Sequence, residues 1–346
     1  MMIRNAWYVA AWADEIADRP LARRICGEPV VLFRDPEGRP HALIDMCCHR
    51  GAPLSIGRVT ELGIECGYHG LTFDGSGACV RIPGQRNIPE RARVRAFPLV
   101  ERDAMLWIWP GDSARADPAL IVPYPYHNDA ARWPHRHTMY AIKGSAMLMV
   151  DNLMDLTHLG YVHVGSIGGN PMTHVEARME TERTQNGLRF TRWMLNSLPP
   201  PTYVKAAGFT GRIDRCQRFE FIAPGAILQW SSADEAGAYA DGQVENSRLK
   251  FRLFHFLTPE TETSCFYFWS TANGYRLDDP TATDQLFAEI GAAFEEDRTV
   301  VEAQQARINE LGEDVLVDIT TDAARIHMRR TIERLEQTEP TPLAAE

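Results

Sequence analysis

The sequence predicts an α+β fold with two domains, in which a small β-domain precedes a domain that combines strands with long helices. Short apolar strand patterns separated by glycine-containing turns fill the first third of the chain. Small and charged residues over 112–118 interrupt this pattern, so we place the domain boundary near residue 115. Beyond it, a helical pattern occupies residues 284–308. The predicted domains are therefore residues 1–115 and 116–346.

The first domain is predicted to be a small β-sandwich. Residues 30–34 and 41–44 are apolar strand candidates, and the turn Asp35-Pro36-Glu37-Gly38 between them is typical of a hairpin. Residues 71–77 repeat this pattern of a short strand followed by a turn, and residues 105–109 form a further apolar strand candidate. We expect the loops at the tips of this sandwich to carry the ligands of a metal centre.

The composition is that of a globular enzyme. The 346 residues are 45% hydrophobic and 24% charged, which is enough for two domains with cores of their own. A net charge of -10 argues against a nucleic-acid partner. Seven cysteines without a repeating framework indicate a reducing compartment. Since neither a signal-peptide pattern nor an apolar stretch of membrane-spanning length is present, we expect a cytoplasmic protein with no membrane association.

Two short runs near the N-terminus each offer one thiolate and one imidazole. Cys47 and His49 lie in Cys-Cys-His-Arg-Gly, and Cys66 and His69 lie in Cys-Gly-Tyr-His-Gly. A Rieske [2Fe-2S] centre needs this set, because one iron takes both cysteines and the other takes both histidines. A structural zinc site accepts the same four donors and is the alternative. The glycine-rich turns favour the Rieske centre, because their N–H groups can point at the sulfides.

Cys48 competes with Cys47 for the first ligand position. We assign Cys47, because the one-residue gap between it and His49 lets the two side chains diverge toward different irons. Cys48 is then not a ligand of the cluster.

A second group of metal-ligating residues follows an apolar helical stretch. On a continuous helix Asp151, Asp155 and His158, spaced four and three apart, would share one face. A break at Gly160 would let the chain swing His163 back toward His158. Two histidines near acidic residues make most of a 2-His-1-carboxylate iron site, although such a pair is also found at packed helix ends.

The third ligand is predicted on the helix over residues 284–308. The buried stripe of this helix is predicted to contain Leu286, Ile290, Ala293, Asp297, Val301, Gln304 and Ile308. Asp297 is the only acid on the stripe, and the two glutamates before it fall outside, as solvated charges do. Because a buried carboxylate needs a partner or a metal, we predict His158, His163 and Asp297 as iron ligands, supported by the carboxylate of Asp155. An ion pair between Asp297 and an arginine is the alternative.

Taken together, these motifs resemble the oxygenase component of Rieske non-haem iron oxygenases. The closer resemblance is to the branch of vanillate O-demethylase, dicamba monooxygenase and toluenesulfonate methyl-monooxygenase. The stretches that carry it span nearly the whole chain: 5–10, 49–55, 67–71, 82–85, 151–158, 257–262 and 296–297. Cys48 is a departure, because the family usually has proline at that position.

The resemblance implies a Rieske β-sandwich and a helix-grip catalytic domain, in which an antiparallel sheet wraps a long helix. It also implies a head-to-tail homotrimer, in which the cluster of one subunit faces the mononuclear iron of the next. In such trimers a carboxylate matching Asp155 bridges a cluster histidine matching His69 to an iron ligand matching His158. A residue matching Asn152 lies beside the iron, so Asp155 and Asn152 are the implied catalytic residues.

The implied function is the terminal oxygenase of a multicomponent monooxygenase, which hydroxylates or O-demethylates a vanillate-like aromatic acid with O2 and electrons from NAD(P)H. Because no Gly-x-Gly-x-x-Gly fingerprint is present, we expect a separate reductase, acting directly or through a ferredoxin. The alternatives are a cis-dihydroxylating dioxygenase, an N-demethylase, a Rieske electron carrier and a zinc-dependent binding module. His255, in the strand-like run 254–257, is either a polar group of the substrate pocket or a satisfied core histidine.

Overall fold

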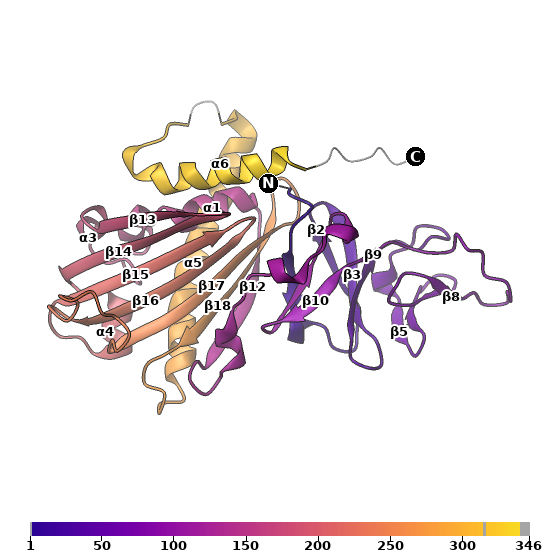
Figure 1. Cartoon of the computed structure of the whole chain (residues 1–346), viewed down its shortest axis with the longest axis horizontal. Coiled ribbons are helices and arrows are strands. Elements are labelled where there is room, and N and C mark those ends of the chain that lie inside the picture. Colours follow the sequence, from indigo (N-terminus) through magenta and orange to yellow (C-terminus); the bar gives the residue numbers. More distant parts are fainter. Residues whose placement is uncertain (1, 314–315, 340–346) are drawn as a thin grey trace. The chain divides into compact units, whose positions relative to one another are not determined.

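The computed structural model describes residues 2–313 and 316–339, which form two compact units (Figure 1). The N-terminal unit consists of Met2–Pro123 together with Thr258–Glu262, and the C-terminal unit consists of Tyr124–Leu257 and Thr263–Thr338. The α+β class is confirmed, whereas the boundary near residue 115 stays a prediction. Over the described ranges, the helices are too short or too polar to traverse a lipid bilayer.

The N-terminal unit is built from short antiparallel strands. They are β1 (Tyr8–Trp12), β2 (Leu21–Ile25), β3 (Glu28–Arg34), β4 (Pro40–Ile44), β5 (Arg58–Thr60), β6 (Gly63–Glu65), β7 (Thr72–Phe73), β8 (Cys79–Arg81), β9 (Ala96–Phe97), β10 (Leu99–Arg102) and β11 (Met105–Ile108). Within the described residues they form three sheets, ordered β1-β11-β10, β2-β3-β4-β9 and β5-β6-β7-β8. The predicted hairpins β3–β4 and β7–β8 are confirmed, because both pairs are antiparallel.

The C-terminal unit contains one antiparallel sheet of seven described strands. They are β12 (His135–Ile142), β13 (Arg178–Thr184), β14 (Gly187–Ser197), β15 (Ile213–Ile222), β16 (Ala226–Glu235), β17 (Leu249–Pro259) and β18 (Cys265–Asn273). Their order in the sheet is β12-β18-β17-β16-β15-β14-β13. Strands β13 to β18 follow one another along the chain, while β12 closes the far edge beside β18. The chain between β12 and β13 therefore has to cross the sheet, and this crossing carries two of the predicted iron ligands.

Helices accompany this sheet. The α-helices are α1 (Ala146–Met154), α2 (Leu159–Val162), α3 (Pro171–Val175), α4 (Pro201–Ala207), α5 (Ala282–Leu311) and α6 (Ala323–Gln337). The short 3-10 helices are η1 (Ala13–Glu15), η2 (Leu54–Ile56), η3 (Ser113–Arg115), η4 (Pro118–Leu120), η5 (Pro125–Asn128), η6 (Leu156–His158) and η7 (Thr320–Asp322). The long helix α5 packs on β12 and β18 and is contacted by α1 and α4 (Figure 1). This is the helix-grip arrangement that the resemblance implied.

The buried stripe of α5 follows the predicted pattern until near the end of the helix. Leu286, Ile290, Ala293, Asp297 and Val301 are buried. The prediction for Gln304 is wrong, because Gln304 is exposed and the next residue is buried in its place. This residue, Gln305, accepts a hydrogen bond from the backbone N–H of Ser145 at 2.8 Å. The side chain of Ser145 in turn caps α1, so α5 holds the start of the helix that carries Asn152.

Candidate metal centres and active site

The two predicted cluster loops share one backbone conformation. The N–H of Cys47 donates to the carbonyl five residues later at 2.8 Å, and its own carbonyl accepts from Gly51 at 2.9 Å. Cys66 repeats both bonds, with lengths of 2.8 Å and, to Gly70, 3.0 Å. Gly51 and Gly70 have φ of 72° and 73°, a conformation that side chains rarely adopt. The repeated glycine in both motifs is therefore a requirement of this turn.

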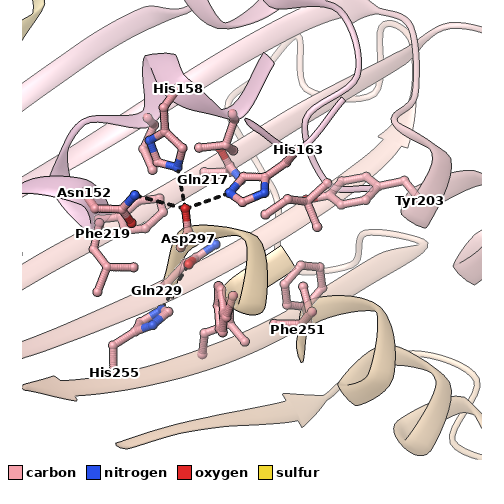
Figure 2. Close-up of a pocket in the computed structure, with 17 residues that line it drawn as sticks. Asn152, His158, His163, Tyr203, Gln217, Phe219, Gln229, Phe251, His255 and Asp297 are labelled. Carbon is pink, nitrogen blue, oxygen red and sulfur yellow. Dashed lines mark hydrogen bonds and ion pairs between the residues drawn. The ribbon is translucent and has the colours of Figure 1, made fainter. Parts of the chain in front are cut away.

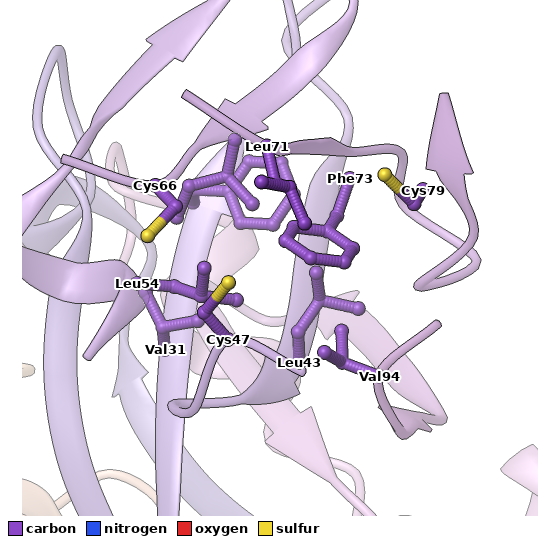
Figure 3. Close-up of a cluster of buried hydrophobic side chains, with 11 residues drawn as sticks. Val31, Leu43, Cys47, Leu54, Cys66, Leu71, Phe73, Cys79 and Val94 are labelled. Atoms are coloured by element: carbon purple, nitrogen blue, oxygen red, sulfur yellow. The ribbon is translucent and has the colours of Figure 1, made fainter. Parts of the chain in front are cut away.

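The loops present sulfur inward and imidazole outward. Cys47 and Cys66 are each 2% exposed and belong to a core cluster of the N-terminal unit (Figure 3). His49 and His69 are exposed, and their ring centroids lie 4.7 Å apart. Burial raises the pKa of the Cys47 thiol to about 11. Two buried thiols beneath two adjacent imidazoles are the donor set of a cluster with one inner and one outer iron.

A second donor set converges in the C-terminal unit, between α5 and the sheet (Figure 2). One ligand atom each from His158, His163 and Asp297 lies within 4.8 Å of the others. The Oδ1 atom of Asp297 is 3.4 Å from Nε2 of His158 and 3.1 Å from Nε2 of His163. The structure thus brings together the three residues predicted as iron ligands.

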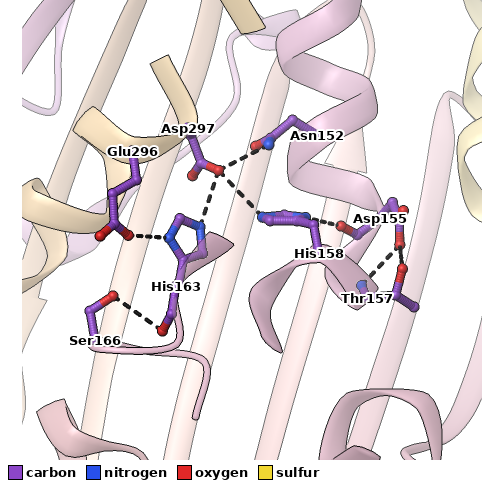
Figure 4. A network of polar contacts seen from close by, with 8 residues as sticks. All are labelled: Asn152, Asp155, Thr157, His158, His163, Ser166, Glu296 and Asp297. Carbon is purple, nitrogen blue, oxygen red and sulfur yellow. Dashed lines mark hydrogen bonds and ion pairs between the residues drawn. The ribbon is translucent and has the colours of Figure 1, made fainter. Parts of the chain in front are cut away.

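The other ring nitrogen of each histidine has a defined acceptor (Figure 4). Nδ1 of His163 lies 2.7 Å from Oε2 of Glu296, and Nδ1 of His158 contacts the backbone carbonyl of Asp155. A neutral imidazole that donates from Nδ1 keeps its lone pair on Nε2. Both lone pairs therefore face the same point, which is the arrangement that a bound metal requires.

The charges at this point also fit a cation. Asp297 is 2% exposed; burial raises its pKa, but the two histidines lower it more, so that the pKa is about 2. Asn152 donates from Nδ2 to Asp297 Oδ1 at 3.0 Å, and its own buried Oδ1 has no partner among the described residues. A buried carboxylate beside an unsatisfied amide oxygen leaves polar groups that a metal and its ligands would satisfy.

The helix around these histidines differs from the prediction. The shared face proposed for Asp151, Asp155 and His158 is wrong, because α1 ends at Met154 and Asp155 is extended, with φ of -106° and ψ of 101°. The Asp155 carboxylate caps η6 by accepting from the N–H and the hydroxyl of Thr157 at 2.9 and 2.7 Å. This local capping competes with helix continuation. The carbonyl of Asp155, not its carboxylate, therefore supports His158.

The remaining acids take other places. Asp151 forms an ion pair with Arg329 of α6. Glu296 was predicted to be a solvated charge, which is only partly correct. Its side chain is 45% exposed, but its carboxylate also contacts Nδ1 of His163. Its position directly before Asp297 was the only signal in the sequence. The contact forms because the turn after α2 brings His163 against α5.

The pocket at the three ligands is mainly apolar. Its wall consists of Asn152, Leu153, Leu156, His158, Leu159, His163, Ile167, Tyr203, Gln217, Phe219, Gln229, Phe251, Leu253, His255, Ile290, Phe294 and Asp297. His255 is 1% exposed and bonds Tyr267 Oη through Nδ1 at 2.7 Å and Gln229 Oε1 through Nε2 at 3.3 Å. Burial lowers its pKa to about 3, so the ring is neutral. His255 both lines the pocket and has its hydrogen bonds satisfied.

Two family models match the two parts of the chain. The Rieske [2Fe-2S] domain matches residues 6–98, and the vanillate O-demethylase oxygenase C-terminal domain matches residues 142–338, more than half of the sequence. The chain belongs to the vanillate O-demethylase oxygenase family. It is therefore the oxygenase component of a Rieske monooxygenase, with a [2Fe-2S] cluster, a non-haem iron and O2 as cosubstrate. The alternatives of a stand-alone electron carrier and a zinc module are excluded.

Members of the family with known activities resemble this oxygenase over their full length. It is 39% identical over 342 residues to the toluene-4-sulfonate monooxygenase iron-sulfur subunit of Comamonas testosteroni, covering 98% of each chain. It is 37% identical to the vanillate O-demethylase oxygenase subunit of a Pseudomonas species, covering 97% of this chain and 95% of the relative. The structure of dicamba monooxygenase bound to 3,6-dichlorosalicylic acid superposes with a TM-score of 0.91 at 35% identity, covering 97% and 98% of the two chains.

We expect Cys48→Ser to retain the visible Rieske spectrum of this oxygenase. Cys48 is exposed, whereas Cys47 and Cys66 point into the core that the cluster would share. The measurement is the visible absorption and EPR spectrum of the purified variant, with Cys47→Ser as the matched control that loses it. Loss of the spectrum in Cys48→Ser, together with its retention in Cys47→Ser, would move the ligand by one residue.

We expect Glu296→Gln to weaken iron binding at the second centre by about 10-fold, because a neutral amide orients and polarises the His163 ring less than a carboxylate does. The measurement is the dissociation constant of Fe(II), from titration of protein stripped of mononuclear iron. Glu295→Gln is the control, since Glu295 pairs with Arg298 at 2.8 Å and does not touch a ligand. Equal affinities for Glu296→Gln and the unmodified protein would contradict a role for Glu296.

Proposed function

We propose that this oxygenase hydroxylates a methyl or methoxy carbon of a small aromatic acid. The observation that carries the proposal is the convergence of His158, His163 and Asp297 in an apolar pocket. The relatives named for vanillate, dicamba and toluene-4-sulfonate support the substrate class. With a methoxyarene, the hydroxylated carbon leaves as formaldehyde and a phenol remains. The balance is one O2 and one NAD(P)H consumed for each methyl group, with one oxygen atom released as water.

The residues for the two metal groups follow from the donor sets. Cys47, His49, Cys66 and His69 would hold the [2Fe-2S] cluster. His158, His163 and Asp297 would hold the mononuclear iron. When bound, the cluster supplies single electrons and the iron supplies the activation of O2.

The chain itself orients these ligands and keeps water out. The carbonyl of Asp155 and the carboxylate of Glu296 fix the rings of His158 and His163. Asn152 donates to the Asp297 oxygen that also faces both rings. The leucine and phenylalanine side chains of the wall exclude water from the space in which the substrate would lie. A dry pocket restricts oxidation to the carbon held beside the iron.

The oxygenase would need a partner protein for its supply of electrons. A separate reductase would deliver electrons from NAD(P)H, directly or through a ferredoxin, as the names "oxygenase subunit" and "oxygenase component" of the relatives suggest. We also propose a cytoplasmic homotrimer, in which the Asp155 carboxylate of one subunit meets His69 of the next. In favour of this, the Asp155 carboxylate uses its Oδ1 for Thr157, while its Oδ2 accepts no hydrogen bond from the described residues.

The test is O2 uptake with product analysis, using a surrogate reductase and a panel of methoxy-, methyl- and sulfonated benzoates. Formaldehyde released in proportion to O2 with a methoxybenzoate is the expected result. A cis-diol would identify a dioxygenase instead. Formaldehyde only from an N-methylaminobenzoate, included as a further probe, would identify an N-demethylase. O2 uptake without any organic product from the panel would contradict the substrate class.

A further inference from the structure

Two arginines are buried in the sheet beside the pocket. Arg192 of β14 and Arg215 of β15 are each 1% exposed. Among the described residues, neither guanidinium lies within ion-pair distance of a carboxylate, in contrast to Arg34, Arg189 and Arg329. The Asp155 carboxylate acts on Arg192 only from a greater distance. Buried charges without a counter-charge are costly, and proteins retain them where a ligand supplies the missing charge.

Arg192 has only neutral acceptors. It donates from Nη1 to Oε1 of Gln217 and from Nη2 to the carbonyl of His174, both at 3.2 Å. His174 does not compete as a charge, because burial lowers its pKa to about 4 and its Nε2–H donates to the carbonyl of Gly168 at 2.8 Å. Burial also lowers the pKa of Arg192 itself, to about 9, which still leaves the guanidinium protonated at neutral pH.

Arg215 is still less satisfied. Its Nη2 donates to the carbonyl of Ile167 at 3.4 Å, while its buried Nε and Nη1 have no partner among the described residues. Its Cζ lies 4.7 Å from the ring centroid of Tyr203. Ile167 and Tyr203 are both part of the pocket wall, so the guanidinium lies directly behind that wall.

Strand geometry connects Arg215 with a donor in the pocket. Arg215, Gln217 and Phe219 alternate along β15 and share one face, and the last two line the pocket (Figure 2). A guanidinium carries only donors, so Arg192 must face the carbonyl end of the Gln217 amide. This fixes the orientation of the amide and makes its Nε2 group the donating end, which forms no hydrogen bond with the described residues.

The geometry points to an anion-binding wall at Gln217 that receives the acid group of the substrate, with Arg215 directly behind the wall and Arg192 orienting the amide. The ligand class is an aryl carboxylate or sulfonate, and this inference rests on the proposed function. His255, the polar pocket group expected from the sequence, is neutral and already bonded to Tyr267 and Gln229. In contrast, the wall at Gln217 combines an amide donor with the buried guanidinium of Arg215, whose Nε and Nη1 have no partner among the described residues.

The test compares anionic and neutral probes of matched shape on the holoenzyme, by calorimetry without a reductase. The pairs are 4-methoxybenzoate with 4-methoxybenzamide, and toluene-4-sulfonate with toluene-4-sulfonamide. The unmodified protein should prefer the anion of at least one pair, and the preferred pair tells carboxylate from sulfonate. Arg215→Met should weaken binding of that anion by about 10- to 100-fold and change binding of the neutral probe little. Arg218→Met is the control, because Arg218 points to the opposite face of the same strand.

A second pair of variants covers the case in which Arg215→Met does not fold. Gln217→Glu should abolish anion binding by repulsion, and Gln217→Leu should reduce the anion preference without removing the charge of Arg215. Equal affinity of the unmodified protein for the anionic and neutral member of both pairs, or an anion preference that survives in Arg215→Met or in Gln217→Glu, would overturn the inference. Because calorimetry does not depend on turnover, anion binding without methyl oxidation would contradict the proposed function alone.

Discussion

Replacing Asp297 by alanine is expected to leave the Rieske spectrum intact while removing mononuclear iron and turnover. Asp297 is the only carboxylate that faces both Nε2 atoms of the histidine pair within the described residues. Its loss should cost more than the roughly 10- to 100-fold that follows the loss of a ligand's supporting partner. The cluster should survive, since Asp297 and the cysteine loops belong to different compact units.

The measurements are iron per chain, the visible spectrum and O2-dependent product formation. Glu295→Ala is the matched control, since it removes a carboxylate from the same turn of α5 without touching a histidine. Full iron content and full activity in Asp297→Ala would refute the assignment. Glu296, which already contacts His163, would then be the next candidate.

The second large effect is expected for Asp155→Asn, which should retain both metals and turn over about 10- to 100-fold more slowly. The fold should be preserved, because an asparagine Oδ1 can still accept from the N–H of Thr157 and the His158 contact uses the backbone. The second carboxylate oxygen, however, becomes an NH2 group. This group cannot accept a hydrogen bond from an imidazole N–H, so the proposed link to His69 of a neighbouring subunit would be lost.

The measurements are metal content, cluster reduction by dithionite and single-turnover kinetics. Co-assembly of inactive Cys66→Ser subunits with inactive His158→Ala subunits tests the route directly. Activity that returns in mixed oligomers requires the cluster of one chain to serve the iron of another. No recovery in oligomers of verified mixed composition would mean that electron transfer occurs within one chain, and a fully active Asp155→Asn would remove Asp155 from the route.

The spacing of residues that are close in the sequence was enough to predict both cluster loops and the choice of Asp297. The two Cys-x-His and Cys-x-x-His runs predict their loops because ligands and turn glycines lie within five residues of each other, and the structure shows both turns with the same hydrogen bonds. The stripe of α5 singled out Asp297 for a similar reason. Helical periodicity is a property of the local chain, and an isolated acid on an apolar stripe stands out without knowledge of its partner.

Only the tertiary structure decided how distant segments meet. The role of Glu296 could not be read from α5, because it depends on the turn that brings His163 against that helix. Likewise, capping by Asp155 ended α1 where periodicity predicted its continuation, so the backbone took over the support of His158. The burial of Arg215 without an ion-pair partner among the described residues is also invisible in the sequence. Whether a buried charge has a partner depends on the side chains that other strands and helices place around it, and these contacts exist only in the folded chain.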